Sequence, residues 1–289
     1  MKILPISADS LGVRSMCIFV KTNDVNILID PGAALGPKRY GLPPHPLEVK
    51  ALDDSLKKIR KFMRKSDILI ITHYHYDHYI PDESELYEGK FLLIKHPKEN
   101  INHSQRIRSK NFLDVIDDLP KKVEYGDGRE FRFGATKLKF SPAVWHGPVN
   151  SKVGKVIMVS INDGDQKFVY GSDAQGLLDK EALEWVVNEN PDIAVIDGPP
   201  TIFIGWRMKA TILTDSIKNI NLVLQKTKVK TILLEHHVVR DVNYKQKMRD
   251  VFEIAEKVGK KVLNYAEYLG TKPLYLEAWR KELYQGTKP

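Results

Sequence analysis

The segment His73-Tyr74-His75-Tyr76-Asp77-His78 constrains this chain more than any other feature of its sequence. It directly follows the run Asp67–Thr72, which has the length and apolar composition of a strand buried on both faces. Three imidazoles and a carboxylate within six residues are costly to bury unless each has a partner. Imidazole and carboxylate together are suitable ligands for Zn, Fe and Mn. The segment therefore predicts a metal site at the end of a buried strand.

Further candidate ligands lie where other predicted strands give way to loops. His146 precedes a Gly-Pro pair, Asp173 follows a β-like run, and His236 follows another. Protein sites collect at such positions, because the scaffold is rigid and the loop is free. Within the six-residue segment, a turn would let His78 join Asp77 at a second position. The combined set of five histidines and two aspartates matches a site for two metals.

Composition excludes several other classes of site. The chain has one cysteine, Cys17, so a disulfide framework, a zinc finger and a cysteine-ligated iron–sulfur cluster are excluded. Cys17 lies in an apolar run, and we expect it to be an inert core thiol. The formal net charge of +8 favours anionic partners, either phosphorylated metabolites or nucleic acid.

Nothing in the sequence resembles a membrane or secretion signal. No apolar run approaches the ~20 residues that span a bilayer, and the first ten residues lack the apolar core of a signal peptide. We therefore expect a cytoplasmic protein with no membrane partner.

Short apolar runs alternate with amphipathic stretches along the chain. Ile18–Val20 and Val25–Ile29 predict a hairpin, and Leu47–Lys65 has apolar residues at helical spacing. Several β-like runs precede an alternation of helix and strand patterns, which favours a mixed sandwich covered by helices over a doubly wound sheet. We expect one domain over residues 1–289, with a C-terminal helical stretch at about 273–285 that packs on the body or forms an oligomer contact.

The ligand pattern as a whole resembles the metallo-β-lactamase superfamily. The matching features are His-x-His-x-Asp-His, a later histidine, an aspartate in a Gly-Ser-Asp context and a final histidine after a strand. The resemblance runs from about Asp30 to His237, and the stretches SLGVRSM, IDPGAALGPKRYGLPPHPLE and EHHVVRD are similar to an archaeal subgroup. It implies an αββα four-layer sandwich that holds two divalent transition metals, Zn first and Mn or Fe as alternatives, at one edge of the paired sheets.

The resemblance also implies a role for each ligand position. Asp30, in an Ile-Asp-Pro-Gly context, would orient ligands by hydrogen bonding. The metal ligands would be His73, His75 and His146 for the first metal, Asp77, His78 and His236 for the second, and Asp173 between the two.

Two of these assignments have alternatives within the chain. His237 is adjacent to His236 and could be the ligand in its place; with His236 as the ligand, His237 is left to orient ligands or to donate a proton. His96 and His103 are alternatives to His146, although His103 falls in an apparent helix.

This ligand set implies hydrolysis by a hydroxide that two metals activate, since bound metal lowers the pKa of water toward ~7. Asp77 would accept a hydrogen bond from the hydroxide, and His237 would protonate the leaving group. We expect a small anionic ester, thioester, lactone, lactam or phosphodiester as substrate. Because arginine binds phosphate and carboxylate bidentately, the Gly32–Glu48 loop and the last strand end supply the candidate substrate-binding residues: Lys38, Arg39, Tyr40, His45 and Arg240.

Two other functions compete with this one. The first is a nuclease acting on RNA or DNA, which the basic charge favours. The span from Asp173 to His236 is too short for the extra domain of β-CASP nucleases, and the chain has no long insertion like that of ribonuclease Z. The second is a non-hydrolytic protein, either a metal-bound binding module or an iron oxidoreductase relative. The flavin domain of flavodiiron proteins does not fit within this chain.

Overall fold

Two β-sheets form the centre of the molecule in the computed structural model, which describes residues 1–288. The first sheet has six strands in sequence order, with its first three strands antiparallel and the remainder parallel. These strands are β1 (Lys2–Pro5), β2 (Ile18–Lys21), β3 (Asn26–Ile29), β4 (Ile68–Ile71), β5 (Phe91–Ile94) and β6 (Lys122–Tyr125).

The second sheet has seven strands in the order β15-β14-β13-β12-β11-β8-β7. From β7 to β12 neighbours are antiparallel, and from β12 to β15 they are parallel. Its strands are β7 (Glu130–Phe133), β8 (Thr136–Phe140), β11 (Val159–Asn162), β12 (Lys167–Tyr170), β13 (Ile193–Asp197), β14 (Thr231–Glu235) and β15 (Lys261–Leu263). A separate short pair joins β9 (Val144–Trp145) and β10 (Lys155–Val156).

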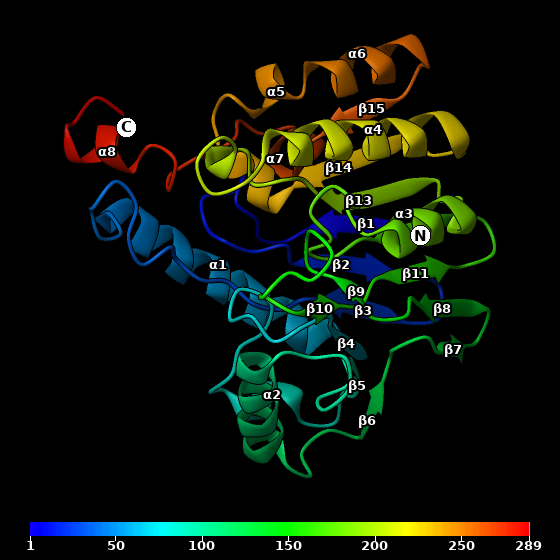
Figure 1. Cartoon of the computed structure of the whole chain (residues 1–289). Helices are drawn as coiled ribbons and strands as arrows, with labels where there is room; N and C mark the ends of the chain where they lie inside the picture. Colours follow the sequence, from blue (N-terminus) through cyan, green and yellow to red (C-terminus); the bar gives the residue numbers. More distant parts are fainter. Residues whose placement is uncertain (289) are drawn as a thin grey trace.

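Helices cover both outer faces of the paired sheets (Figure 1). The first sheet packs against α1 (Pro46–Lys65) and α2 (His103–Ile116), and the second against α3 (Lys180–Glu189), α4 (Ala210–Lys226) and α6 (Arg249–Lys257). The remaining helical turns are short: η1 (Ser84–Tyr87), η2 (Thr201–Phe203), η3 (His236–Arg240), α5 (Tyr244–Lys247), α7 (Tyr265–Tyr268) and α8 (Arg280–Tyr284).

The alternation of side chains along β4 shows why the layers form. Ile68 and Ile70 face the second sheet and belong to the core between the sheets. Leu69 and Ile71 face the other way, into the core beneath α1 and α2. All four side chains are buried, which explains the continuous apolar run. The result is an αββα four-layer sandwich, which confirms the expected fold class.

Some elements differ from the sequence-based expectations. The sequence pattern of Tyr244–Val258 predicts one long helix, but the structure divides it into α5 and α6, because Met248 leaves helical geometry at φ −106° and ψ 25°. The strands β6 and β7 lie at sheet edges and alternate charged with apolar or aromatic residues, and they were not predicted from the sequence. Over residues 1–288, no helix combines the length and the apolar composition needed to cross a bilayer.

Candidate metal centre

The carboxyl ends of strands from both sheets meet at one edge of the sandwich. Asp30 follows β3, His73 follows β4, Asp173 follows β12 and His236 follows β14. Asp30 and His236 have positive φ angles of 49° and 66°, as does Ser172 at 48°. Non-glycine residues rarely adopt this backbone conformation, and they collect where the surrounding structure enforces a functional geometry.

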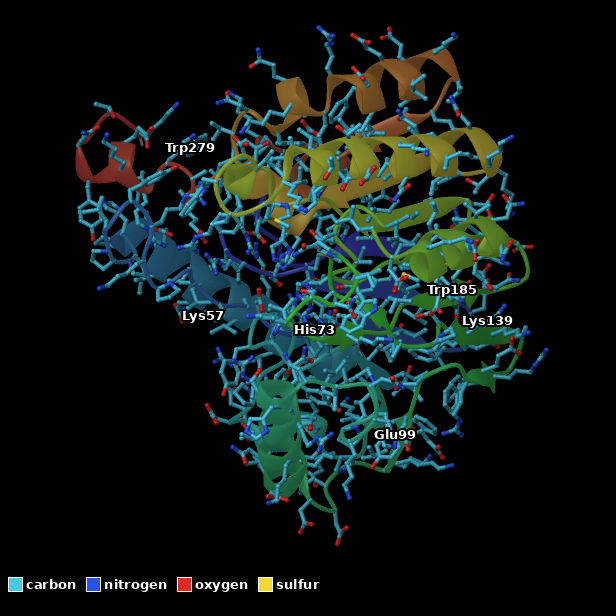
Figure 2. The ribbon with its side chains drawn as sticks, viewed as in Figure 1. Lys57, His73, Glu99, Lys139, Trp185 and Trp279 are labelled. Carbon is cyan, nitrogen blue, oxygen red and sulfur yellow. The ribbon has the colours of Figure 1, made fainter. Side chains whose placement is uncertain are left out.

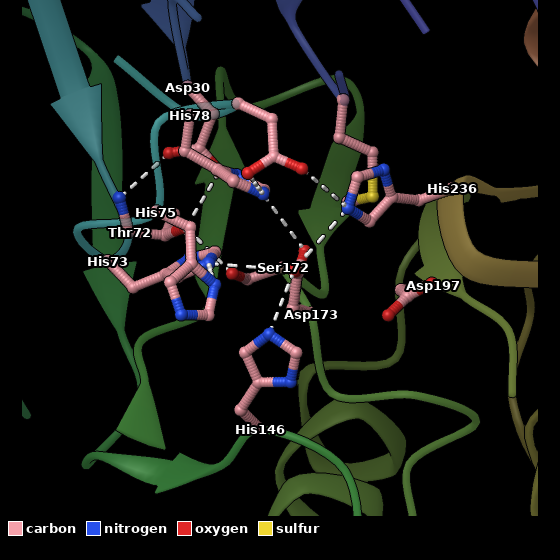
Figure 3. A network of polar contacts seen from close by, with 12 residues as sticks. Asp30, Thr72, His73, His75, His78, His146, Ser172, Asp173, Asp197 and His236 are labelled. Atoms are coloured by element: carbon pink, nitrogen blue, oxygen red, sulfur yellow. Dashed lines mark hydrogen bonds and ion pairs between the residues drawn. The ribbon is translucent and has the colours of Figure 1, made fainter. Parts of the chain in front are cut away.

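Asp173 lies at the centre of the residues that meet there (Figure 3). Its Oδ2 atom is 3.1 Å from His146 Nε2, 3.4 Å from His236 Nε2 and 3.5 Å from His73 Nε2. Its Oδ1 atom is 3.3 Å from His78 Nε2. Although burial raises the pKa of Asp173, the charges of the surrounding histidines outweigh it and hold this pKa well below its usual range. Figure 2 shows His73 near the middle of the molecule.

The possible ligand atoms form four overlapping groups. The atoms of the first group lie within 4.8 Å of one another and come from His73, His75, His146 and Asp173. Those of the second group satisfy the same distance and come from Asp77, His78 and His236. A turn separates these two groups, since the backbone N–H of His78 donates to the carbonyl of His75 at 2.9 Å. The other two groups consist of Asp30, His73 and His78, and of Asp173, His236 and His237.

Asp30 orients His78 through a buried hydrogen-bond network. The His78 Nδ1 atom lies 2.8 Å from Asp30 Oδ2. Asp30 also accepts hydrogen bonds from the Thr72 backbone N–H at 2.8 Å, the Thr72 hydroxyl at 2.7 Å and the Tyr170 hydroxyl at 2.7 Å. With Nδ1 held by a carboxylate, Nε2 of His78 is directed at Asp173 with its lone pair available to a metal.

Asp9 plays the equivalent part for His236. Its Oδ2 atom is 2.7 Å from His236 Nδ1, and its Oδ1 atom accepts from Arg240 Nε at 2.7 Å. Arg240 Nη2 lies 3.7 Å from Asp77 Oδ2 and 3.2 Å from His236 Nε2. Asp9 thus links a candidate ligand to a cation beside it. Asp9 was not predicted from the sequence, because no local pattern marks a single aspartate whose partner lies 227 residues away.

His237 has a different environment from its neighbour. Its Nδ1 atom lies 2.9 Å from Asp197 Oδ2. Its backbone N–H donates a hydrogen bond to Asp197 Oδ1 at 3.0 Å. Burial, Arg240 and His236 lower the pKa of His237 well below its usual value, so the ring is neutral at neutral pH. A neutral ring that donates from Nδ1 presents a hydrogen-bond acceptor at Nε2. His237 also lies in one ligand group with Asp173 and His236, and its expected roles as proton donor or alternative ligand stay predictions.

The donor set fits divalent transition metals on two grounds. His78 Nε2 and Asp173 Oδ1 are buried and have no hydrogen-bond partner among residues 1–288, although such atoms are nearly always satisfied. Nitrogen and carboxylate oxygen donors in this combination suit Zn, Fe or Mn. His96 and His103 lie outside these groups: His96 accepts backbone hydrogen bonds in its own loop, and His103 begins α2.

A cavity of about 950 Å³ opens beside the candidate ligands. The Gly32–Glu48 loop contributes Ala34, Leu35 and Pro37 to its wall, and Arg240 also lines it. Its volume is at the upper end of the range for small-molecule sites.

The other basic and aromatic residues expected to bind substrate do not line this cavity. His45 caps the N-terminus of α1, with Nδ1 accepting from the Leu47 backbone N–H. Arg39 is bound to Glu277 and to the carbonyl of Arg240, and the Tyr40 hydroxyl donates to the carbonyl of Ala278. Lys38 is exposed outside the cavity. The helix cap and the C-terminal half of the chain thus bind His45, Arg39 and Tyr40, whereas Lys38 is exposed.

Comparisons with known proteins agree with this architecture. A family model described as "Beta-lactamase superfamily domain" matches residues 25–237. A UPF0282 protein of Pyrococcus abyssi is 42% identical over 297 residues, which cover 99% of this chain and 93% of that protein.

Solved structures of low sequence identity share the fold. The metallo-β-lactamase fold protein YhfI from Bacillus subtilis has a TM-score of 0.55 at 17% identity, over 90% of this chain and 93% of that one. An isothiocyanate hydrolase from Delia radicum gut bacteria has a TM-score of 0.53 at 14% identity, over 91% of this chain and 95% of that one. Asp9 and Glu277 both lie outside the residues that the family model matches.

Proposed function

Because the chain belongs to the β-lactamase superfamily and, within it, to the family of the UPF0282 proteins, we propose that it is a metal-dependent hydrolase. The observation that carries this proposal is the convergence of seven ligand-type side chains on one edge of the sandwich. Structural stability alone gives no reason to collect so many ionisable groups in a buried position.

We assign the ligands as two sets that share one carboxylate. When bound, divalent transition metals supply Lewis acidity and lower the pKa of water toward ~7. Zn suits this donor set, and Mn or Fe are alternatives. The proposed ligands are His73, His75 and His146 for one metal, Asp77, His78 and His236 for the other, and Asp173 for both.

Residues around the ligands complete the proposed chemistry. Asp77 is placed by Arg240 and accepts a hydrogen bond from the attacking water. His237, which Asp197 holds at Nδ1, contacts the leaving group or the substrate through Nε2 at the cavity wall. The proposed substrate is a small anionic ester, since Arg240 and other cations line the cavity.

Metal content and hydrolysis together test this proposal. Protein purified without added metal or chelator should hold nearly two transition-metal ions per chain by elemental mass spectrometry, and should hydrolyse at least one of a panel of esters, lactones and phosphodiesters. His75→Ala should lower the metal content and abolish turnover, because His75 is a proposed ligand. His96→Ala is the matched control, because His96 lies outside both ligand groups. Absence of metal and of activity after addition of Zn or Mn would contradict the proposal.

A further inference from the structure

The cavity wall beyond the candidate ligands is positively charged. Its cationic residues come from four separate parts of the chain, whereas among residues 1–288 its only carboxylates are the candidate ligands Asp77 and Asp173. The cations are Arg14, Arg108, Arg207, Lys209 and Arg240. A concave surface lined by one sign of charge concentrates ligands of the opposite sign.

Three of these cations form no ion pair among residues 1–288, although Arg108 Nη1 donates to the Tyr74 carbonyl at 3.3 Å. Arg14 forms an ion pair with Glu277, and Arg240 forms one with Asp9. Arg108, Arg207 and Lys209, by contrast, have no carboxylate within 4.0 Å among residues 1–288. The cavity therefore retains uncompensated positive charge, which selects an anion rather than a neutral substrate.

Arg108 and Arg207 are each stacked on an aromatic ring. The Arg108 guanidinium carbon lies 4.7 Å from the ring centre of Tyr76, which is 51% exposed. The Arg207 guanidinium carbon lies 4.2 Å from the ring centre of Trp206, which is 66% exposed. Stacking holds a guanidinium in place while its N–H edge stays available for bidentate binding of phosphate.

The two pairs come from different parts of the chain. Tyr76 belongs to the ligand segment and Arg108 to α2, and both line the cavity. Arg207 lines the cavity too, and Trp206 lies in an adjoining hollow that Arg207 and Lys209 share. Exposed aromatic rings interleaved with arginines are the pattern with which proteins bind single-stranded nucleic acid and nucleotides. An anion without a planar ring would have nothing to stack on the exposed rings of Tyr76 and Trp206.

We propose that this cavity and the adjoining hollow together bind a phosphodiester of a nucleoside, with the phosphate on Arg108, Arg207 or Lys209 and a base stacked on Trp206 or Tyr76. This inference rests on the proposed hydrolase function and narrows its substrate class. In the reaction the oxygen of water bonds to phosphorus and the P–O bond to the leaving alcohol breaks. One proton of the water goes to the leaving oxygen, and the other is released from the phosphomonoester product.

Two substrates with one leaving group test the role of the base. These are the p-nitrophenyl ester of thymidine 5′-phosphate and methyl p-nitrophenyl phosphate, which lacks a nucleoside. We expect kcat/KM for the nucleoside ester to be at least roughly tenfold higher, which is the lower part of the range for stacking of one base. Equal values would overturn the proposal. A ten-nucleotide single-stranded RNA with a 5′ label then distinguishes a polynucleotide substrate from a small nucleotide.

Variants of the aromatic–arginine pairs test the assignment to this wall. Trp206→Ala and Arg207→Ala should each lower the ratio of the two kcat/KM values roughly tenfold, and Trp206→Phe should keep most of it, because it retains a ring. Arg132→Ala is the matched control, since Arg132 is exposed on β7 and does not line the cavity. An unchanged ratio in both alanine variants and in Tyr76→Ala would overturn the proposal.

Binding without turnover separates this inference from the proposed function. Adenosine 5′-monophosphate should quench tryptophan fluorescence of the wild-type protein, and the quenching should weaken as salt rises from 50 to 300 mM. Quenching without hydrolysis of any ester would retain the binding site and reject the hydrolase. Hydrolysis of a lactone without nucleotide binding would retain the hydrolase and reject the nucleotide.

Discussion

Replacement of Asp9 by asparagine should weaken one metal position and leave the other unchanged. Asp9 contacts His236, a proposed ligand of the second metal, and has no contact with His73, His75 or His146. Asparagine has the same shape, but its single acceptor oxygen cannot serve both His236 Nδ1 and Arg240 Nε.

The expected magnitude follows from these contacts. Loss of the carboxylate that orients a ligating histidine typically lowers metal affinity about 10–100-fold, or roughly 1.4–2.7 kcal/mol. Arg240, 8% exposed, also loses its charged partner, so the free energy of unfolding should fall by about 1–3 kcal/mol.

Chelator competition with a metal-sensitive dye measures the two affinities separately. For Asp9→Asn we expect one tight and one weakened metal per chain. Asp53→Asn is the control, because Asp53 pairs with Lys57 on the exposed face of α1. Equal weakening of both metals, or no weakening of either, would refute the proposed division of the ligands.

Three further predictions test other parts of the structure. Burial raises the pKa of Glu277, but hydrogen bonds and charge from Arg14 outweigh it and lower this pKa from 4.5 to about 2. The carboxylate therefore stabilises the fold above pH ~4.5, and this contribution is lost as the pH falls toward 2. Urea unfolding should show Glu277→Gln to be less stable than wild type by about 1–3 kcal/mol at pH 7 and by less at pH 3; a constant difference would contradict the assignment. Ile70→Ala removes a fully buried side chain between the sheets and should lower the free energy of unfolding by about 2–5 kcal/mol, and a loss under 1 kcal/mol would argue against tight packing there. Removal of metal by a chelator should lower Tm by roughly 5 °C or more, and addition of Zn should restore it, because metal bound only to the folded state stabilises that state; an unchanged Tm would argue against metal in the purified protein.

Sequence reasoning predicted the layers because their signals are local. The run Ile68–Ile71 is apolar at every position, and α1 repeats its apolar residues at helical spacing. The edge strands β6 and β7 alternate charged with apolar or aromatic residues, and such short runs do not stand out from loops. Their place in the sheets depends on pairing with distant neighbours.

The same distinction applies to the site. His73 and His236 could be proposed as ligands because each directly follows an apolar strand, and strands carry their ends to one edge of a sandwich. The hydrogen bond between Asp9 and His236 joins residues far apart in the sequence. The ion pair between Arg39 and Glu277 does the same. No short sequence pattern predicts contacts between residues that are so far apart along the chain.

One measurement tests the metal centre most directly: crystallography of the purified protein, with anomalous scattering recorded at the absorption edge of the metal that elemental analysis identifies. The proposed function predicts two peaks, one among His73, His75 and His146 and one among Asp77, His78 and His236, with Asp173 contacting both. A single peak, or peaks away from these side chains in protein that contains metal, would contradict it.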